Sequence, residues 1–253
     1  MEGARVRMKL LADRRGKRIL KRRFGALAAV LLLFPPALAY RYANREVVLS
    51  VPYISQQGVL ATGCELVSAA MVLRYCGVPA SVEDVAARTP RADLTWSASG
   101  LSGEHPARAF IGDPHSPEGF GCYAPVIVSV LNSFLKGTGR KAVDRTGSGL
   151  AELALSRVAK GDPVLVWVTM NMKEPRPGKS WKLWGTGETF RWIAGEHCMV
   201  LVGFSADRYY FNDPYESNGL VSYDRKLAES RYEALGRQAA AVEEESTSSG
   251  NHL

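Results

Sequence analysis

Three residues of this chain have side chains that together can carry out nucleophilic catalysis. Cys64 precedes an apolar-periodic segment, His197 begins a strand-like apolar run, and Asp213 follows a short aromatic run. In such chemistry a thiolate attacks a carbonyl carbon, an imidazole accepts and returns the proton, and a carboxylate holds the imidazole in one tautomer. The order cysteine, histidine, acid therefore indicates thiol-dependent hydrolysis of an amide bond.

These residues lie at the ends of predicted elements, where a rigid scaffold can present side chains to a shared site. The spacing of Leu66, Val67, Ala70, Met71 and Leu73 predicts a buried helix that starts at Cys64 and ends at Gly77. A thiol at a helix start meets unpaired N–H groups and the positive end of the helix dipole. We therefore expect a lowered thiol pKa at Cys64 and rapid alkylation at mildly acidic pH.

His197 and Asp213 occupy the two far ends of a predicted β-hairpin with strands near 199–202 and 209–211. Antiparallel pairing brings such ends together. Asn212 is an alternative to Asp213, because papain-like enzymes also use asparagine to orient the histidine. Adjacent strand residues point to opposite faces, so only one of the two faces His197, and we favour Asp213. His197 lies 133 residues after Cys64, within the separation of about 130–150 residues known for papain-like enzymes.

Several short segments resemble a known family when they are taken as a set. They are Val51-Pro-Tyr-Ile-Ser-Gln56, Thr62-Gly-Cys-Glu-Leu-Val-Ser68, Phe110-Ile-Gly-Asp-Pro114, Gly119-Phe-Gly-Cys-Tyr-Ala-Pro125, Glu196-His197 and Phe211-Asn-Asp-Pro214. The set resembles the bacterial peptidase-thirty-nine-like family, papain-like cysteine peptidases related to the bacteriocin-processing, double-glycine leader peptidases. The resemblance covers about residues 48–242.

The resemblance implies an α+β, papain-like fold in which N-terminal helices pack on a mainly antiparallel sheet. It implies a cysteine peptidase with Cys64 as nucleophile, His197 as base and Asp213 as the residue that orients the base. A glutamine upstream of the cysteine would complete the oxyanion hole. Gln56 matches the Ser-Gln pattern of the family, and Gln57 remains the alternative.

The predicted function is hydrolysis of peptide bonds through an acyl-enzyme, with a peptide or protein as substrate. A cell-wall peptide amidase or transpeptidase of the same chemistry is one alternative, and a catalytically silent binding module is another. We expect neither a metal nor a cofactor, because the chain has no CxxC or HxxxH spacing. His105 and His115 lie in a stretch rich in glycine and proline and are expected to face solvent.

The remaining cysteines leave a disulfide question open. Cys76, Cys122 and Cys198 accompany Cys64, and four cysteines in an exported chain allow one or two disulfides in three pairings. We expect Cys64 to remain free, and Cys198 to point away from His197.

The charge of the chain is concentrated at its N-terminus. Residues 1–24 hold ten Lys/Arg against two acids, whereas the whole chain has a net charge of +7. This distribution argues against a nucleic-acid-binding face on the rest of the protein. The basic run and the apolar residues 24–34 are typical of an export signal, with Ala37-Leu-Ala39 as a cleavage site. Residues 1–40 are thus a signal peptide or, if uncleaved, a membrane anchor, and either places the remaining protein outside the cytoplasm.

The predicted catalytic domain spans residues 48–242, followed by an acidic, disordered tail over 243–253. A capping box at Ser81 predicts a short helix, and residues 91–122 are expected to form a long loop. Further helices are predicted near 125–136, 149–160 and 224–235, a central strand over 163–169, and an edge strand near 238–242. Trp181, Trp184 and Trp192 either cap the core or form an aromatic wall for a substrate.

Overall fold

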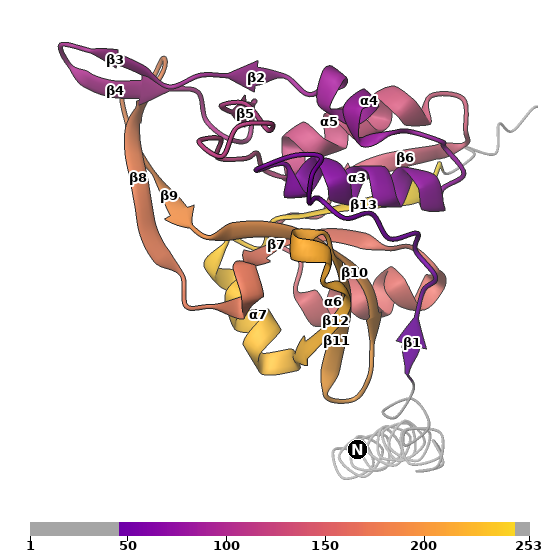
Figure 1. Cartoon of the computed structure of the whole chain (residues 1–253). Helices are drawn as coiled ribbons and strands as arrows, with labels where there is room; N and C mark the ends of the chain where they lie inside the picture. The colour runs from indigo at the N-terminus through magenta and orange to yellow at the C-terminus, as the bar shows by residue number, and fades with distance from the viewer. Residues whose placement is uncertain (1–45, 246–253) are drawn as a thin grey trace, which may run out of the picture. The chain divides into compact units, whose positions relative to one another are not determined.

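A computed structural model describes residues 46–245 of the protein (Figure 1). The predicted export signal, its cleavage site and most of the acidic tail lie outside the described residues. No helix within residues 46–245 is both long enough and apolar enough to span a bilayer.

A seven-stranded sheet organises the described part of the chain. Six strands follow the order β12-β11-β10-β7-β13-β6, β1 pairs with β10, and every pairing is antiparallel. The strands are β1 (Val47–Val48), β6 (Arg140–Asp144), β7 (Val164–Thr169), β10 (Glu196–Phe204), β11 (Arg208–Asp213), β12 (Gly219–Asp224) and β13 (Ala239–Glu244). All residues of β7 are buried, as expected for a central strand covered on both faces.

Helices cover both faces of this sheet (Figure 1). On one face lie α3 (Cys64–Tyr75), α4 (Val82–Arg88) and α5 (Ala124–Leu135), with α3 against β10 and β7 and α5 against β13 and β6. On the other lie α6 (Leu150–Ser156) and α7 (Arg225–Ala234), with α7 against β7 and α6 against β10. Two hydrophobic clusters result, and β10 contributes Cys198 and Val200 to the first and Met199 and Leu201 to the second. Alternation along β10 therefore decides which side of the sheet each of its side chains faces.

Most of the predicted helices form where local signals placed them. The Ser81 hydroxyl accepts the Asp84 N–H at 3.0 Å and the Asp84 carboxylate accepts the Ser81 N–H at 2.9 Å, so the predicted capping box starts α4. The helix expected near 149–160 is shorter than predicted, because α6 ends at Ser156 and a 3-10 turn, η1 (Val158–Lys160), follows. Two further 3-10 turns are η2 (Met170–Met172) and η3 (Tyr215–Ser217).

The prediction of an edge strand near 238–242 is wrong in one respect. The strand is present as β13, but it lies between β7 and β6, so β6 is the edge. The strand also continues into the segment expected to be a disordered tail. There the Glu243 carboxylate accepts a hydrogen bond from the Arg145 guanidinium at 2.7 Å and lies 3.1 Å from the Arg157 guanidinium. A paired, largely buried glutamate can remain in a strand interior where an isolated one would favour solvent.

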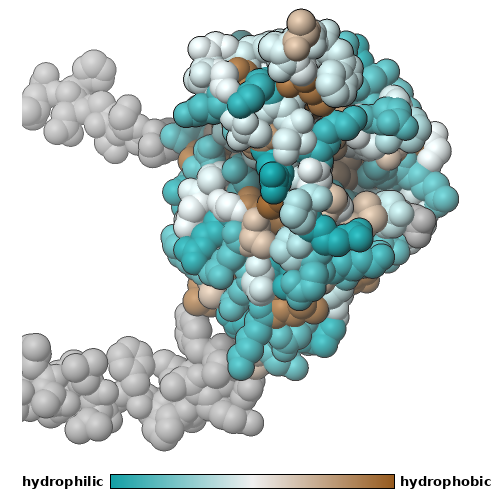
Figure 2. Space-filling model, turned by 90° about the vertical axis from the view of Figure 1, so that its left-hand side faces the viewer, coloured by the Kyte–Doolittle hydropathy of each residue, from teal (hydrophilic) through white to brown (hydrophobic). Residues whose placement is uncertain are grey.

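The expectation that residues 91–122 form a loop without regular structure is also wrong. This segment contains β2 (Arg91–Ala92), β3 (Thr95–Ser97), β4 (Gly100–Gly103) and β5 (Phe110–Ile111). β4 pairs in parallel with β8 (Arg176–Leu183), which pairs with β9 (Thr189–Ala194) to give the small sheet β3-β4-β8-β9. β4 pairs with β3 in a local hairpin, but its other partner, β8, lies eighty positions away in the chain (Ser102 pairs with Lys182), so a local pattern could not reveal that pairing. Figure 2 views the side of the molecule that carries this small sheet and shows hydrophobic residues scattered among hydrophilic ones.

Candidate active site

Cys64 is the first residue of α3 and is 6% exposed. The chain reaches the helix through Gly63, where an added Cβ would lie 2.4 Å from Leu60 Cδ1. Gly63 caps the helix without a side-chain hydrogen bond, so the N–H groups of the first turn are not used by a capping side chain. The thiol therefore sits at a tightly packed helix start, as the sequence predicted.

His197, near the start of β10, and Asp213, at the end of β11, form a buried pair. Both are 1% exposed, and His197 Nε2 lies 2.6 Å from Asp213 Oδ1. The same carboxylate accepts the Tyr215 N–H at 3.0 Å and the Asn218 amide at 3.1 Å. Burial by itself raises the pKa of Asp213, but the hydrogen bond and charge of His197 and the two other donors outweigh it and hold this pKa below its usual value. An ionised Asp213 accepts from Nε2–H, which leaves Nδ1 of the ring for a second partner.

The register of β11 separates Asp213 from Asn212. The Asn212 amide donates to the Val51 carbonyl at 3.0 Å, on the face opposite to His197. The contact with His197 is therefore made by Asp213 and not by Asn212.

The backbone of β10 connects the thiol to the histidine. The Cys198 N–H donates to Cys64 Sγ at 3.3 Å, and Cys198 directly follows His197. The pairing of β10 with β11 begins only at Val200, so the thiol lies beside β10 at the end where β11 has separated from it. The fold thus brings Cys64, His197 and Asp213 to one end of β10.

The expected low pKa of Cys64 is wrong. Burial raises the pKa of the thiol well above its ordinary value, and the neighbouring carboxyl groups of Glu65 and Glu196 raise it further. The Cys198 N–H acts in the opposite direction and does not compensate. The thiol is accordingly a donor at rest, 3.4 Å from Glu65 Oε2. The position at a helix start does not lower the pKa of Cys64, because burial of the thiol and then the two carboxyl groups beside it outweigh the effect of the helix.

Gln56 and Gln57 differ sharply in position. Gln57 is exposed, whereas Gln56 is 7% exposed and its backbone N–H donates to the carbonyl of Pro214, the residue after Asp213. The Gln56 amide donates to the Ala61 carbonyl at 3.1 Å and retains a second N–H, while its Oε1 has no hydrogen-bond partner. Both glutamines contact the segment that follows Asp213, since Gln57 Oε1 accepts from the Ser217 hydroxyl at 3.5 Å, but of the two only Gln56 is buried.

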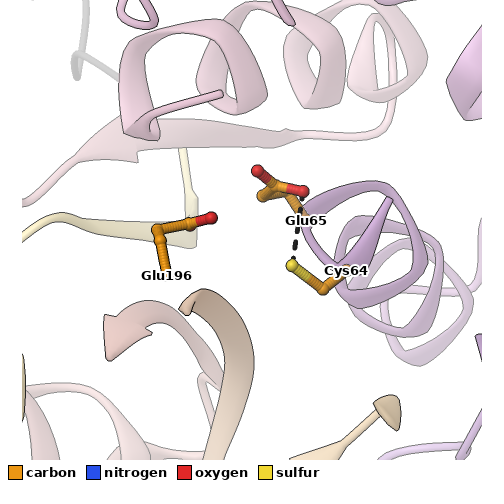
Figure 3. A group of neighbouring side chains, drawn as sticks. All are labelled: Cys64, Glu65 and Glu196. Atoms are coloured by element: carbon orange, nitrogen blue, oxygen red, sulfur yellow. Dashed lines mark hydrogen bonds between the residues drawn. The ribbon is translucent and has the colours of Figure 1, made fainter. Parts of the chain in front are cut away.

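Sequence reasoning missed Glu65 and Glu196, which lie beside the thiol (Figure 3). Glu65 is fully buried and accepts the Cys122 N–H at 2.7 Å; burial raises the pKa of Glu65 to about 7. Burial and the nearby Glu65 raise the pKa of Glu196 as well. The sequence does hold one indication of Glu196. It is two positions before Cys198 on a buried strand, so its side chain lies on the same face as that of Cys198, the face covered by α3.

Gly121 allows the two carboxyl groups to converge. An added Cβ there would lie 2.3 Å from Glu65 Oε1 and 3.2 Å from Glu196 Oε2. Sγ of Cys64 and one oxygen of each carboxyl group all lie within 4.8 Å of one another, which makes these three residues a candidate metal-binding group.

The other residues singled out by sequence have structural environments. All four cysteines are unpaired, and Cys198 points away from His197 as expected. His115 is exposed and pairs with Asp113 and Glu83, but His105 is only partly exposed, because its ring packs edge-on against Phe190.

The three tryptophans were expected either to cap the core or to form an aromatic wall for a substrate. Trp181 and Trp192 are buried members of the core cluster, whereas Trp184 is 42% exposed. Capping of the core therefore accounts for the first two.

A helix that begins at a buried cysteine and packs on an antiparallel sheet carrying a hydrogen-bonded histidine and aspartate defines the papain-like α+β class of proteins. Residues 48–240 match the Peptidase_C39 like family, and the chain belongs to that family. It is 30% identical over 184 residues to the uncharacterized protein YvpB of Bacillus subtilis (strain 168), covering 73% of this chain and 70% of YvpB.

The solved structure of a Bacillus anthracis protein assigned to the C39-like peptidases aligns with a TM-score of 0.70 and 26% identity, over 79% of this chain and 98% of that one. The predicted family and the predicted papain-like α+β fold are confirmed. Membership of this family supports a peptidase.

Proposed function

We propose that the protein is a thiol hydrolase that cleaves peptide bonds with Cys64 as nucleophile, His197 as base and Asp213 as the residue that orients the base. The main support for the proposal is the buried 2.6 Å hydrogen bond between His197 and Asp213. The residue after His197 on β10 is Cys198, and its backbone N–H donates to the Cys64 thiol.

Proton transfer follows from the hydrogen bonds of the imidazole. Asp213 occupies Nε2, so Nδ1 accepts the Cys64 proton as Sγ attacks the carbonyl carbon. The resulting imidazolium is stabilised by Asp213 and returns the proton to the leaving amine, which leaves an acyl group on Sγ. Water then hydrolyses the thioester and restores the thiol. The raised pKa of Cys64 means that the nucleophile is generated during the reaction and is not stored as a thiolate at rest.

The oxyanion of the tetrahedral intermediate needs donors close to Cys64. The N–H of Cys64 itself, at the start of α3, is one donor, and the free N–H of the Gln56 amide is the second. Each such donor contributes about 10²–10³ in rate.

Export is part of the proposal. The basic run of residues 1–24 and the apolar segment that follows would direct the catalytic domain across the cytoplasmic membrane, with or without cleavage after residue 39. The test is to express in cells the full chain and a chain that lacks residues 1–40. For each chain one measures whether an external protease or a membrane-impermeant thiol reagent reacts with it. Equal protection of both would contradict export.

The central experiment measures hydrolysis of a peptide library by purified protein. The Cys64→Ala and His197→Ala variants should lose hydrolysis, whereas Cys76→Ala, which removes a thiol elsewhere, should retain it. Circular dichroism establishes that each variant is folded. Hydrolysis that persists in Cys64→Ala would refute the proposal, and a folded wild type that cleaves muropeptides but no ordinary peptide would identify a cell-wall amidase instead.

A further inference from the structure

Cys64, Glu65 and Glu196 form a compact buried group that the hydrolytic mechanism does not use as a whole (Figure 3). Their candidate ligand atoms lie within 4.8 Å of one another, and Cys64 Sγ is 3.4 Å from Glu65 Oε2. Two of these residues begin α3 and the third begins β10, so rigid elements hold the group in place.

Glu196 supplies a second, independent observation. It is 8% exposed, and its Oε1 has no hydrogen-bond partner. Figure 3 shows its carboxyl group extended toward Glu65 and Cys64 from the opposite side. Buried polar oxygens are normally satisfied, so the unpaired oxygen indicates that the Glu196 carboxyl group lacks a partner.

The charge of the group indicates what that partner is. Two carboxyl groups are buried side by side, and among residues 46–245 no lysine or arginine is recorded as an ion-pair partner of either. Gly121 carries no side chain that would displace the two carboxyl groups, because an added Cβ would lie 2.3 Å from Glu65 Oε1. A small cation fits this combination of buried acidic ligands and absent basic side chains.

The ligand set distinguishes among cations. Magnesium and calcium prefer oxygen ligands alone, whereas a thiolate combined with carboxylates favours zinc. With Zn–S of about 2.3 Å and Zn–O of about 2.1 Å, a tetrahedral site has S···O edges of about 3.6 Å. The observed 3.4 Å between Cys64 Sγ and Glu65 Oε2 lies close to this value.

We propose that Cys64, Glu65 and Glu196 bind one Zn²⁺ ion through Sγ and one oxygen of each carboxylate. A fourth position remains for water or another ligand. The Zn–S bond replaces the S–H bond of Cys64, and each carboxyl group binds as a carboxylate. The thiol proton and any proton held by Glu65 or Glu196 are released to solvent, so no oxidant or reductant is required.

Zinc binding blocks Cys64 as a nucleophile. This consequence rests on the proposed function, because it assumes that Cys64 attacks the substrate. The ion occupies the sulfur electron pair that would attack the carbonyl, so the protein is inactive while zinc is bound and active after the ion is removed. The site is therefore a reversible zinc-dependent off-switch.

The experiment titrates metal-free, full-length protein with Zn²⁺ against a chromophoric chelator, and with Co²⁺ as a spectroscopic probe. Wild type should bind one zinc and show the near-ultraviolet band of a cobalt–thiolate bond. Glu196→Gln should weaken zinc binding by at least about 10–100-fold, the range that even outer-sphere partners of a metal contribute. Cys64→Ser should abolish the cobalt band.

Two control variants test the location. Cys76→Ser removes the half-buried thiol, and His115→Ala removes the surface histidine that pairs with Asp113 and Glu83. Both should bind zinc as wild type does. Zinc affinity that is unchanged in Cys64→Ser and in Glu196→Gln, or lost in His115→Ala, would overturn the proposal.

Activity separates this inference from the proposed function. For each variant that hydrolyses peptide, the ratio of the rate with zinc to the rate with chelator is measured. The ratio should be far below one in wild type and close to one in Glu196→Gln. Cys64-dependent zinc binding in a protein without any hydrolytic activity would uphold the metal site and refute the hydrolase, and zinc-insensitive hydrolysis would do the reverse.

Discussion

Replacing Glu65 with Gln should change how the stability of the protein depends on pH. Glu65 is fully buried at the start of α3, and burial raises its pKa from 4.5 to about 7. A carboxyl group with a raised folded-state pKa holds its proton longer in the folded than in the unfolded protein. Stability therefore falls as pH rises from 4.5 to about 7, and changes no further above that range.

The size of the effect follows from the two pKa values. Each pH unit between them corresponds to 1.36 kcal/mol, so wild type should lose about 3 kcal/mol of unfolding free energy across this interval. For a domain of this size that loss is equivalent to about 6–12 °C in Tm. Glu65→Gln preserves an acceptor for the Cys122 N–H and removes the titrating group.

Urea unfolding at pH 4 and pH 8, with chelator present, measures the effect. The unfolding free energy of Glu65→Gln relative to that of wild type should rise by about 3 kcal/mol from pH 4 to pH 8. For the control Glu118→Gln, which changes an exposed residue, this difference should stay the same. The raised pKa of Glu196 acts in the same direction, so wild type itself should lose at least this amount. A Glu65→Gln variant whose stability relative to wild type is the same at both pH values would refute the argument.

Three further predictions follow from the site. Asp213→Ala should lower peptide turnover by about 10²–10⁴-fold, because the base loses its orienting partner, while folded Asn212→Ala should retain turnover in the same rate assay; equal losses would point to structural damage. Alkylation of Cys64 by iodoacetamide, mapped by mass spectrometry, should be slow at pH 6 and accelerate into the alkaline range, because burial and Glu65 raise the thiol pKa; fast labelling at pH 6 would instead indicate a thiolate stabilised by the helix start. Gly121→Ala should destabilise the fold by about 1–3 kcal/mol in urea unfolding, because the added Cβ meets Glu65 Oε1 at 2.3 Å; an unchanged midpoint would contradict the packing.

Local signals predicted the elements that carry the candidate triad. The apolar period after Cys64 predicted α3, the run over 163–169 predicted β7, and two short apolar runs with a turn predicted the hairpin β10–β11. These patterns depend on neighbours within a few residues, which is the range in which helix and hairpin preferences act.

Elements that depend on distant partners were not predictable in this way. β4 pairs with its neighbour β3 but is joined to the small sheet by β8, and β13 is interior because β6 covers its outer side. Neither segment has a hydrophobic pattern that identifies such a partner, so the first was assigned to a loop and the second to an edge.

The sequence by itself determined the residue types, their order, the helix start at Cys64 and the hairpin that joins His197 to Asp213. Tertiary structure decided which of the two neighbouring residues contacts the histidine, because the strand turns Asp213 toward His197 and Asn212 toward the Val51 carbonyl. It also decided the protonation of the thiol, because Glu65 and Glu196 come from elements 131 positions apart and only folding buries them beside Cys64. Electrostatic effects depend on distance in space and on exclusion of water, and neither is encoded in any short segment of the chain.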